Sequence, residues 1–124
     1  MPRLENDLLE VCRDLYEGKL QLHKPVYSSK ACTTVVLASG GYPGNFEKNY
    51  PITIPNKIYE DSFVYHAGTR FNENNELLTN GGRVLMVTSL GNTFSDAMEK
   101  SMELATEISF DYKYYRKDIG YEFV

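Results

Sequence analysis

Residues 79–88 read Thr79-Asn80-Gly81-Gly82-Arg83-Val84-Leu85-Met86-Val87-Thr88. Two glycines let the main chain bend and approach a neighbouring segment, and the apolar run after them is typical of a buried β-strand. Arg83 stands at the start of this strand, so its guanidinium is a candidate contact for a phosphate or an oxyanion. The alternative is a β-hairpin in which Arg83 only lies across the sheet surface.

Other strands are expected on both sides of this stretch. Residues 31–38 are rich in β-branched side chains and predict a buried strand, whose partner the sequence does not identify. Residues 63–69 predict another strand, followed by an Asn-rich turn at 72–75 and a short strand at 77–78. Together with the long strand at 83–90, these segments predict an antiparallel meander.

The chain is expected to begin with an amphipathic helix. Its apolar residues recur at helical spacing, acidic residues favour the first turn, and Gly18 fits just past the end. The residues of the apolar face are Leu4, Leu8, Val11, Cys12 and Leu15, and the acidic residues of the first turn are Glu5 and Asp7.

A second helix is predicted to begin after Thr93, which is a suitable N-cap with Asp96 three residues on. Its inner face would consist of Phe94, Ala97, Met98, Ser101, Ala105 and Ile108. The fold class is therefore α+β, an antiparallel sheet meander covered by one helix and preceded by the amphipathic N-terminal helix. Residues 1–30 would form a helix and connector, and residues 31–124 the α+β domain.

Charge and length exclude several classes of function. The chain has 124 residues and a net charge of −4, so its field repels nucleic acid and anionic membranes. The longest apolar runs, at 35–38 and 84–87, are far too short to cross a bilayer. With only two cysteines and no signal-peptide pattern, we expect a reduced, cytoplasmic protein.

No catalytic set and no metal site can be identified. His66 lies within a predicted strand, where it is either a polar contact in a cleft or a hydrogen-bonded sheet residue. Cys12 and Cys32 are expected to be small core residues.

Two further segments are open to a binding role. The turn Gly40-Gly41-Tyr42-Pro43-Gly44 could offer backbone amides to a ligand or be structural. The tyrosines of the tail could stack on a base or pin the terminus to the sheet.

Four segments in this order resemble the C-terminal domain of glycinamide ribonucleotide synthetase, the phosphoribosylamine–glycine ligase family. They are Val35 to Gly44, Tyr65-His66-Ala67-Gly68-Thr69, Thr79 to Leu85, and Tyr114-Tyr115-Arg116-Lys117-Asp118-Ile119-Gly120-Tyr121. The resemblance spans essentially the whole chain, and four ordered motifs are more specific than any one of them.

The resemblance implies a role within an ATP-grasp ligase. The family joins glycine to 5-phosphoribosylamine with ATP, through a glycyl phosphate, in de novo purine synthesis. The family's upstream domains, which bind ATP and Mg (or Mn), are absent here, so we expect a fragment that is inactive alone, binds no cofactor, has no catalytic residue and closes the substrate cleft. By analogy, Arg83, Gly81 and Gly82 would bind substrate, assisted by Arg116 and Lys117, with Gly40 and Gly41 facing the same cleft.

Two alternatives remain open from the sequence. The chain could be a stand-alone module that binds a phosphorylated metabolite or a partner protein, or a structural domain that only shields a cleft. In the ligase, the apolar face of the first helix would pack on the upstream ATP-grasp domains. Without them, we expect the helix to associate with a second copy or to be held loosely.

Overall fold

The computed structural model describes residues 1–57 and 59–123. The chain forms two compact units, Met1–Lys30 and Ala31–Val124, and each is described by itself. No helix in the described ranges is both long enough and apolar enough to span a membrane.

The first unit contains helix α1 (Leu8–Tyr16) and the short 3-10 helix η1 (Leu20–Leu22). Asp7 is the N-cap, because its carboxylate accepts hydrogen bonds from the backbone N–H groups of Leu9 at 2.8 Å and Glu10 at 3.3 Å. The prediction that Leu4 belongs to this helix is wrong, since Leu4 precedes the cap and forms an isolated β-bridge with Tyr27. Gly18 follows the helix end with φ +72°, as predicted.

Helix α1 buries none of its residues. Leu8 is 49% exposed and Leu15 is 59% exposed. Cys12 is also exposed, so the prediction that it is a core residue is wrong, whereas Cys32 is half-buried. The predicted helix is present, but the first unit is too short to bury the apolar face of α1.

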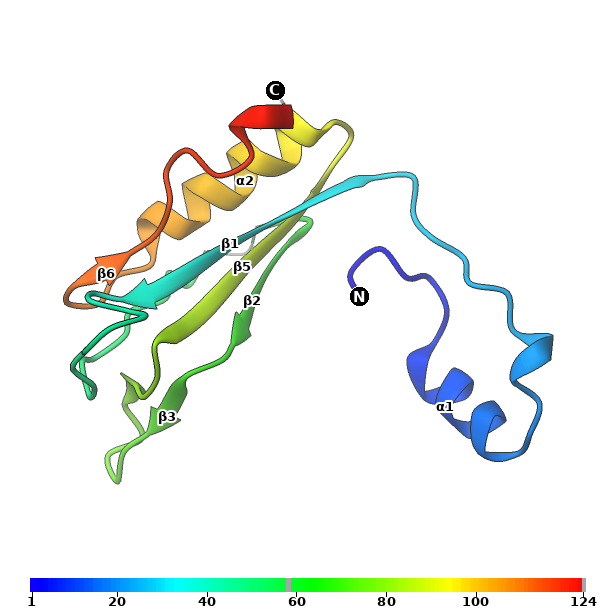
Figure 1. The fold of residues 1–124 in the computed structure, drawn as a ribbon, viewed down its shortest axis with the longest axis horizontal. Coiled ribbons are helices and arrows are strands. Elements are labelled where there is room, and N and C mark those ends of the chain that lie inside the picture. The colour runs from blue at the N-terminus through cyan, green and yellow to red at the C-terminus, as the bar shows by residue number, and fades with distance from the viewer. Residues whose placement is uncertain (58, 124) are drawn as a thin grey trace. The chain divides into compact units, whose positions relative to one another are not determined.

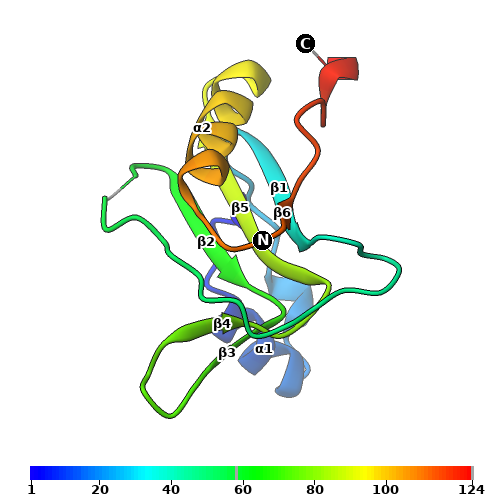
Figure 2. The same cartoon turned by 90° about the vertical axis from the view of Figure 1, so that its left-hand side faces the viewer.

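The elements of the second unit are β1 (Ala31–Ser39), β2 (Ser62–His66), β3 (Thr69–Phe71), β4 (Leu77–Thr79), β5 (Arg83–Gly91), α2 (Phe94–Glu107), β6 (Lys113–Tyr114) and the 3-10 helix η2 (Tyr121–Phe123). Four of the strands form an antiparallel sheet in the order β2-β5-β1-β6, and β3 and β4 form a separate hairpin. Helix α2 lies along one face of the sheet (Figures 1 and 2). The predicted α+β fold, an antiparallel sheet covered by a helix, is confirmed. The predicted meander is wrong, because β2 pairs directly with β5 while β3 and β4 pair with each other in the separate hairpin.

The register of β1 answers the question that the sequence left open. Strand β1 pairs along its length with β5, with Val35 opposite Val87 and Leu37 opposite Leu85. These residues face α2 and form the centre of the buried core. Thr33 adds a polar contact, because its hydroxyl donates to the Ala97 carbonyl oxygen at 2.8 Å.

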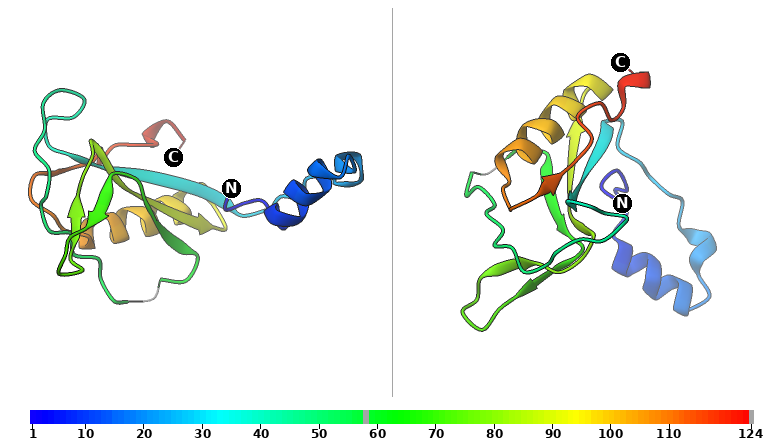
Figure 3. Two further views of the ribbon diagram at one scale, coloured as in Figure 1. Left: turned by 90° about the horizontal axis from the view of Figure 1, so that it is seen from below. Right: turned by 60° about the vertical axis from the view of Figure 1, so that its left-hand side comes forward.

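The predicted single strand over residues 63–69 is two strands, β2 and β3. Between them the chain turns at Gly68, whose N–H donates to the Arg83 carbonyl oxygen at 2.8 Å and whose carbonyl oxygen accepts from the Asn80 N–H at 2.7 Å. The hairpin β3-β4 therefore extends beyond the main sheet (Figure 3). Residues 40–55 form a long loop, which isolated β-bridges hold in place at Pro51, paired with Leu78, and at Thr53, paired with Ser109.

Helix α2 begins as predicted, with the Thr93 hydroxyl accepting from the Asp96 N–H at 3.1 Å. At its other end, the Lys113 ammonium donates to the carbonyl oxygens of Ala105 at 2.8 Å, Thr106 at 3.3 Å and Ile108. Lys113 is in β6, so this contact joins the end of the helix to the edge of the sheet. The tail after β6 packs on the core through Tyr115 and Ile119.

Candidate functional site

Two glycines, Gly68 and Gly81, allow the backbone after β2 to cross closely over the backbone just before β5; this contact is here called the Gly68 crossing. A Cβ atom on Gly68 would lie 2.6 Å from the Gly81 Cα atom and from the Arg83 carbonyl oxygen. A Cβ atom on Gly81 would in turn lie 2.9 Å from the Gly68 Cα atom. Such distances are shorter than any ordinary contact, so both positions require glycine. Because the Gly68 N–H also donates to the Arg83 carbonyl oxygen, the Gly68 crossing holds the backbone of Arg83 in place at the start of β5.

Gly82 contacts the turn that follows β1. A Cβ atom on Gly82 would lie 2.0 Å from Cδ2 of Tyr42, which means that the tyrosine ring lies directly on the Gly82 backbone. The Ser39 N–H donates to the Gly82 carbonyl oxygen and its hydroxyl to the Gly81 carbonyl oxygen, both at 2.8 Å. These contacts hold residues 39–44 next to residues 81–83, so both segments can contribute to one binding site.

Beside this junction lies a cavity of about 300 Å³, here called the Arg83 pocket. Its lining is mostly apolar and aromatic, with two guanidinium groups. The lining residues are Thr34, Val35, Val36, Ala38, Tyr42, Arg83, Tyr114, Tyr115, Arg116 and Ile119. Pockets of this composition bind a ligand's body by apolar contact and orient it through a few polar groups. The lining brings Arg83 and Arg116 together from distant parts of the sequence.

The two arginines of the pocket differ in their partners. Arg116 is bound to Asp118 through two parallel contacts, Nε to Oδ1 at 3.1 Å and Nη2 to Oδ2 at 3.0 Å. This hydrogen bonding raises the pKa of Arg116 and lowers the pKa of Asp118. Within residues 1–57 and 59–123, no hydrogen bond or ion pair engages the exposed Arg83 side chain. Arg83 is thus the cation that can take an anionic ligand without losing a partner.

The remaining predicted site residues lie elsewhere. Gly40 lines a different cavity, and Gly41, with φ +96°, forms a tight turn in which a Cβ atom would lie 2.2 Å from the Asn45 carbonyl oxygen. Lys117 is exposed and lies outside the lining of the Arg83 pocket. The pocket therefore gathers Arg83 and Arg116, with Gly82 beneath its wall, but leaves out Lys117, Gly40 and Gly41.

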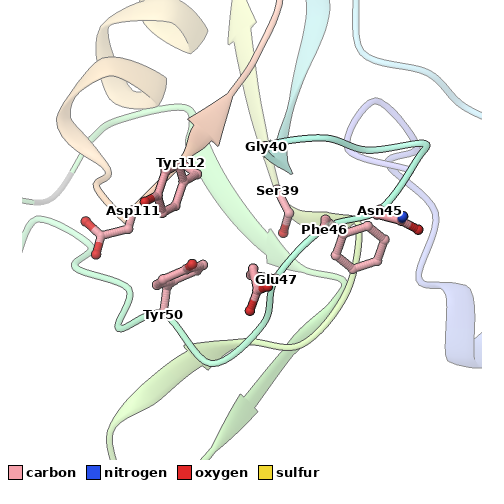
Figure 4. A pocket seen from close by; sticks show the side chains of 8 residues that line it. All are labelled: Ser39, Gly40, Asn45, Phe46, Glu47, Tyr50, Asp111 and Tyr112. Carbon is pink, nitrogen blue, oxygen red and sulfur yellow. The ribbon is translucent and has the colours of Figure 1, made fainter.

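The cavity that Gly40 lines has a volume of about 420 Å³ and is drawn in Figure 4. Tyr50 and Tyr112 lie at one end with ring centroids 5.4 Å apart, and Phe46 lies at the other end. Burial raises the pKa of Tyr50, and the tyrosine hydroxyl of Tyr112 and the carboxylates of Glu47 and Asp111 raise it further. This cavity thus has a negative character, which does not suit a phosphate.

The sequence left several other groups open. The His66 Nδ1 atom and the Thr69 hydroxyl are 3.0 Å apart, so His66 is an exposed, hydrogen-bonded residue at a strand end. The tail is pinned to the domain, because Phe123 contacts Phe94 with ring centroids 5.4 Å apart and Tyr115 packs on the core. Among the described residues, no three His, Cys, Asp or Glu side chains could together hold a metal ion.

Sequence reasoning missed the aromatic part of the pocket. Tyr42 stands inside the Gly-Gly-Tyr-Pro-Gly turn, a pattern that predicts a turn but gives no sign of an aromatic pocket wall. Tyr114 and Tyr115 belong to the aromatic tail, for which the sequence suggests base stacking or anchoring of the terminus but not a pocket wall. The sequence signal for these walls was the arginine that follows the two tyrosines, because ligand pockets combine aromatic side chains with a few polar or charged groups.

Comparisons with known proteins identify the family of this chain. Residues 32–122 match the family described as phosphoribosylglycinamide synthetase, C domain. The chain is 41% identical over 124 residues to a phosphoribosylamine–glycine ligase of Pasteurella multocida, and the match covers 100% of the chain and 29% of that protein. It is 42% identical over 122 residues to a bifunctional purine biosynthetic protein of Dictyostelium discoideum, covering 97% of the chain and 15% of that protein.

A solved structure is also similar. The crystal structure of phosphoribosylamine–glycine ligase from Thermotoga maritima matches with a TM-score of 0.74 and 33% sequence identity, over 90% of this chain and 27% of that one. The chain thus spans less than a third of the length of each of these relatives.

Proposed function

The chain belongs to the phosphoribosylglycinamide synthetase C-domain family, and from that premise we propose that it works as the C-terminal domain of a phosphoribosylamine–glycine ligase. Such an enzyme joins glycine to 5-phosphoribosylamine at the expense of ATP, in the cytoplasm. Family membership over most of the chain favours this function over a free-standing binding module.

In this proposal the chain forms one wall of the substrate cleft. The nucleotide and its Mg²⁺ or Mn²⁺ belong to the upstream ATP-grasp domains, where glycine is activated. The residues of this chain bind and orient the other substrate. Residues 1–30 would then close the ATP-grasp region, with the apolar face of α1 packed on it, which is consistent with the exposure of Leu8 and Leu15.

The observation that carries the proposal is that Arg83 lines the Arg83 pocket while its side chain has no hydrogen bond or ion pair to any other residue that the structure describes. A guanidinium binds phosphate through two parallel hydrogen bonds, which a lysine cannot reproduce. We therefore assign Arg83 to the 5-phosphate of phosphoribosylamine, with Arg116 as the second cation of the same pocket. The Arg116–Asp118 pair keeps that second guanidinium in a fixed orientation.

The experiment uses a chimera in which this chain replaces the matching segment of the Pasteurella multocida ligase. Arg83→Lys should raise the KM for phosphoribosylamine by about tenfold or more, because a charge-assisted bidentate contact is lost, while the KM for ATP changes by less than about twofold. The matched control is Arg70→Lys, since Arg70 is bound to the Asn49 side chain in the outlying hairpin. Equal changes in both KM values, or in neither, would refute the assignment.

A further inference from the structure

The Tyr42 ring is fixed in position by its neighbours. It lies directly on the Gly82 backbone, where no Cβ atom could fit. The Phe46 ring meets it edge-on, with centroids 6.2 Å apart and an interplanar angle of 63°. Tyr42 is nevertheless 41% exposed, and it lines the Arg83 pocket.

The pocket wall next to Arg83 is apolar. Val36, Ala38 and Ile119 contribute aliphatic surface, and Tyr42 and Tyr114 contribute rings. Inorganic phosphate would bind through the arginines alone, because it has no apolar surface that could contact this wall. A ligand whose anionic group is attached to a carbon-rich ring gains both the ionic contact and the apolar contact. The composition of the pocket therefore favours a cyclic organic phosphate over free phosphate.

We propose that Tyr42 is a specificity-determining residue, which packs on the carbon face of a pentose ring while Arg83 holds the 5-phosphate of the same ligand. This inference rests on the proposed function and adds to it the residue that recognises the sugar. It also explains Gly82, since any side chain there would push the Tyr42 ring out of the pocket. The competing explanation is that Tyr42 packs on Gly82 only to stabilise the turn.

The test is an NMR titration of the 124-residue chain with ribose 5-phosphate and, separately, with inorganic phosphate, following the Gly82 and Arg83 amides. We expect ribose 5-phosphate to bind about three- to tenfold more tightly than phosphate, the range that one aromatic contact supplies. Tyr42→Ala should abolish this preference and leave the affinity for phosphate unchanged. Tyr42→Phe should retain the preference, because the ring and not the hydroxyl makes the contact.

Two further variants separate recognition from folding. Tyr42→Leu keeps an apolar side chain over Gly82 without the ring and should lose most of the preference. Tyr16→Ala is the control, because Tyr16 is 93% exposed on α1 and is not part of the pocket. A wild-type chain that binds both anions equally, or a Tyr42→Ala variant that keeps the preference, would overturn the role of Tyr42 while the role of Arg83 stands.

The remaining outcome concerns Arg83 itself. Arg83→Gln should weaken the binding of both anions about tenfold or more, because the charge-assisted hydrogen bonds are lost. If neither anion shifts the Gly82 and Arg83 amides, the assignment of Arg83 in the proposed function is refuted, and the role of Tyr42 is refuted with it.

Discussion

Replacing Lys113 by methionine should destabilise the second unit by about 2 kcal/mol. The Lys113 ammonium donates to three carbonyl oxygens at the end of α2, those of Ala105, Thr106 and Ile108. Hydrogen bonds from a charged donor contribute roughly 1.5–3 kcal/mol, and a cation at a helix C-terminus adds a few tenths to about 1 kcal/mol. Burial lowers the pKa of Lys113, and the same desolvation offsets part of this gain.

Urea denaturation measures the effect directly. With a slope of about 2 kcal/mol/M, a loss of about 2 kcal/mol lowers the midpoint by roughly 1 M and leaves the slope unchanged. Methionine preserves the length of the aliphatic stem, so the change isolates the ammonium group. Lys117→Met is the matched control, because Lys117 is exposed four residues further along and should leave the midpoint within about 0.2 M of wild type.

A functional readout accompanies the stability measurement. Lys113 joins α2 to β6, and β6 leads into the segment that carries Arg116. Below the unfolding transition, the Lys113→Met variant should therefore bind ribose 5-phosphate more weakly than the Lys117→Met control. A midpoint equal to that of the control would refute the reasoning, since it would mean that water replaces the ammonium at the helix end without cost.

Three other predictions follow from the same structure. Gly68→Ala should cost about 1–3 kcal/mol in urea denaturation, because its Cβ atom would lie 2.6 Å from two backbone atoms of the crossing segment; a loss below 0.5 kcal/mol, on the scale of about ±0.5 kcal/mol for an ordinary surface change, would contradict this. Hydrogen bonding from Arg116 lowers the pKa of Asp118 from 3.8, so the pair stabilises the folded chain above pH 3.8, and this stabilisation is lost as the pH falls through the lower pKa of the folded state. In an NMR titration, Arg116→Gln should return the pKa of Asp118 toward 3.8. An unchanged pKa of Asp118 in this variant would contradict the role of the pair. The exposed face of α1 should cause self-association that Leu8→Ser with Leu15→Ser reduces in light scattering, whereas a strict monomer with a protease-resistant N-terminus would argue against it.

Local patterns in the sequence predicted most of the secondary structure. Helix α2, its Thr93 cap and the long strand β5 are as expected, because each depends on residues close together in the chain. The start of α1 was misplaced because apolar periodicity does not reveal which acidic residue becomes the cap, and Asp7 rather than Leu4 marks the boundary. The break between β2 and β3 was missed because it depends on the Gly68 crossing, a contact with a distant segment.

The candidate site was predicted in part for the same reason. The sequence predicted Arg83 as a cation at the start of a strand and, through the family resemblance, Arg116 as a second cation that assists it. In the structure both arginines line one pocket. It did not reveal that Tyr42 belongs to this pocket, since that depends on the ring lying over Gly82, some forty residues away in the sequence. Nor could it show that Gly40 belongs to a separate, negatively charged cavity, since that follows from the position of the loop that carries Glu47.

The rate of ligation by the chimera with the Pasteurella multocida protein tests the central proposal most directly. If this chain supplies the wall that binds phosphoribosylamine, the chimera should join glycine to phosphoribosylamine with ATP at a rate within about tenfold of the intact relative, while the 124-residue chain alone should show no glycine-dependent ATP turnover. A folded chimera that binds ATP and glycine but forms no product, or a chain that turns over ATP by itself, would contradict the account.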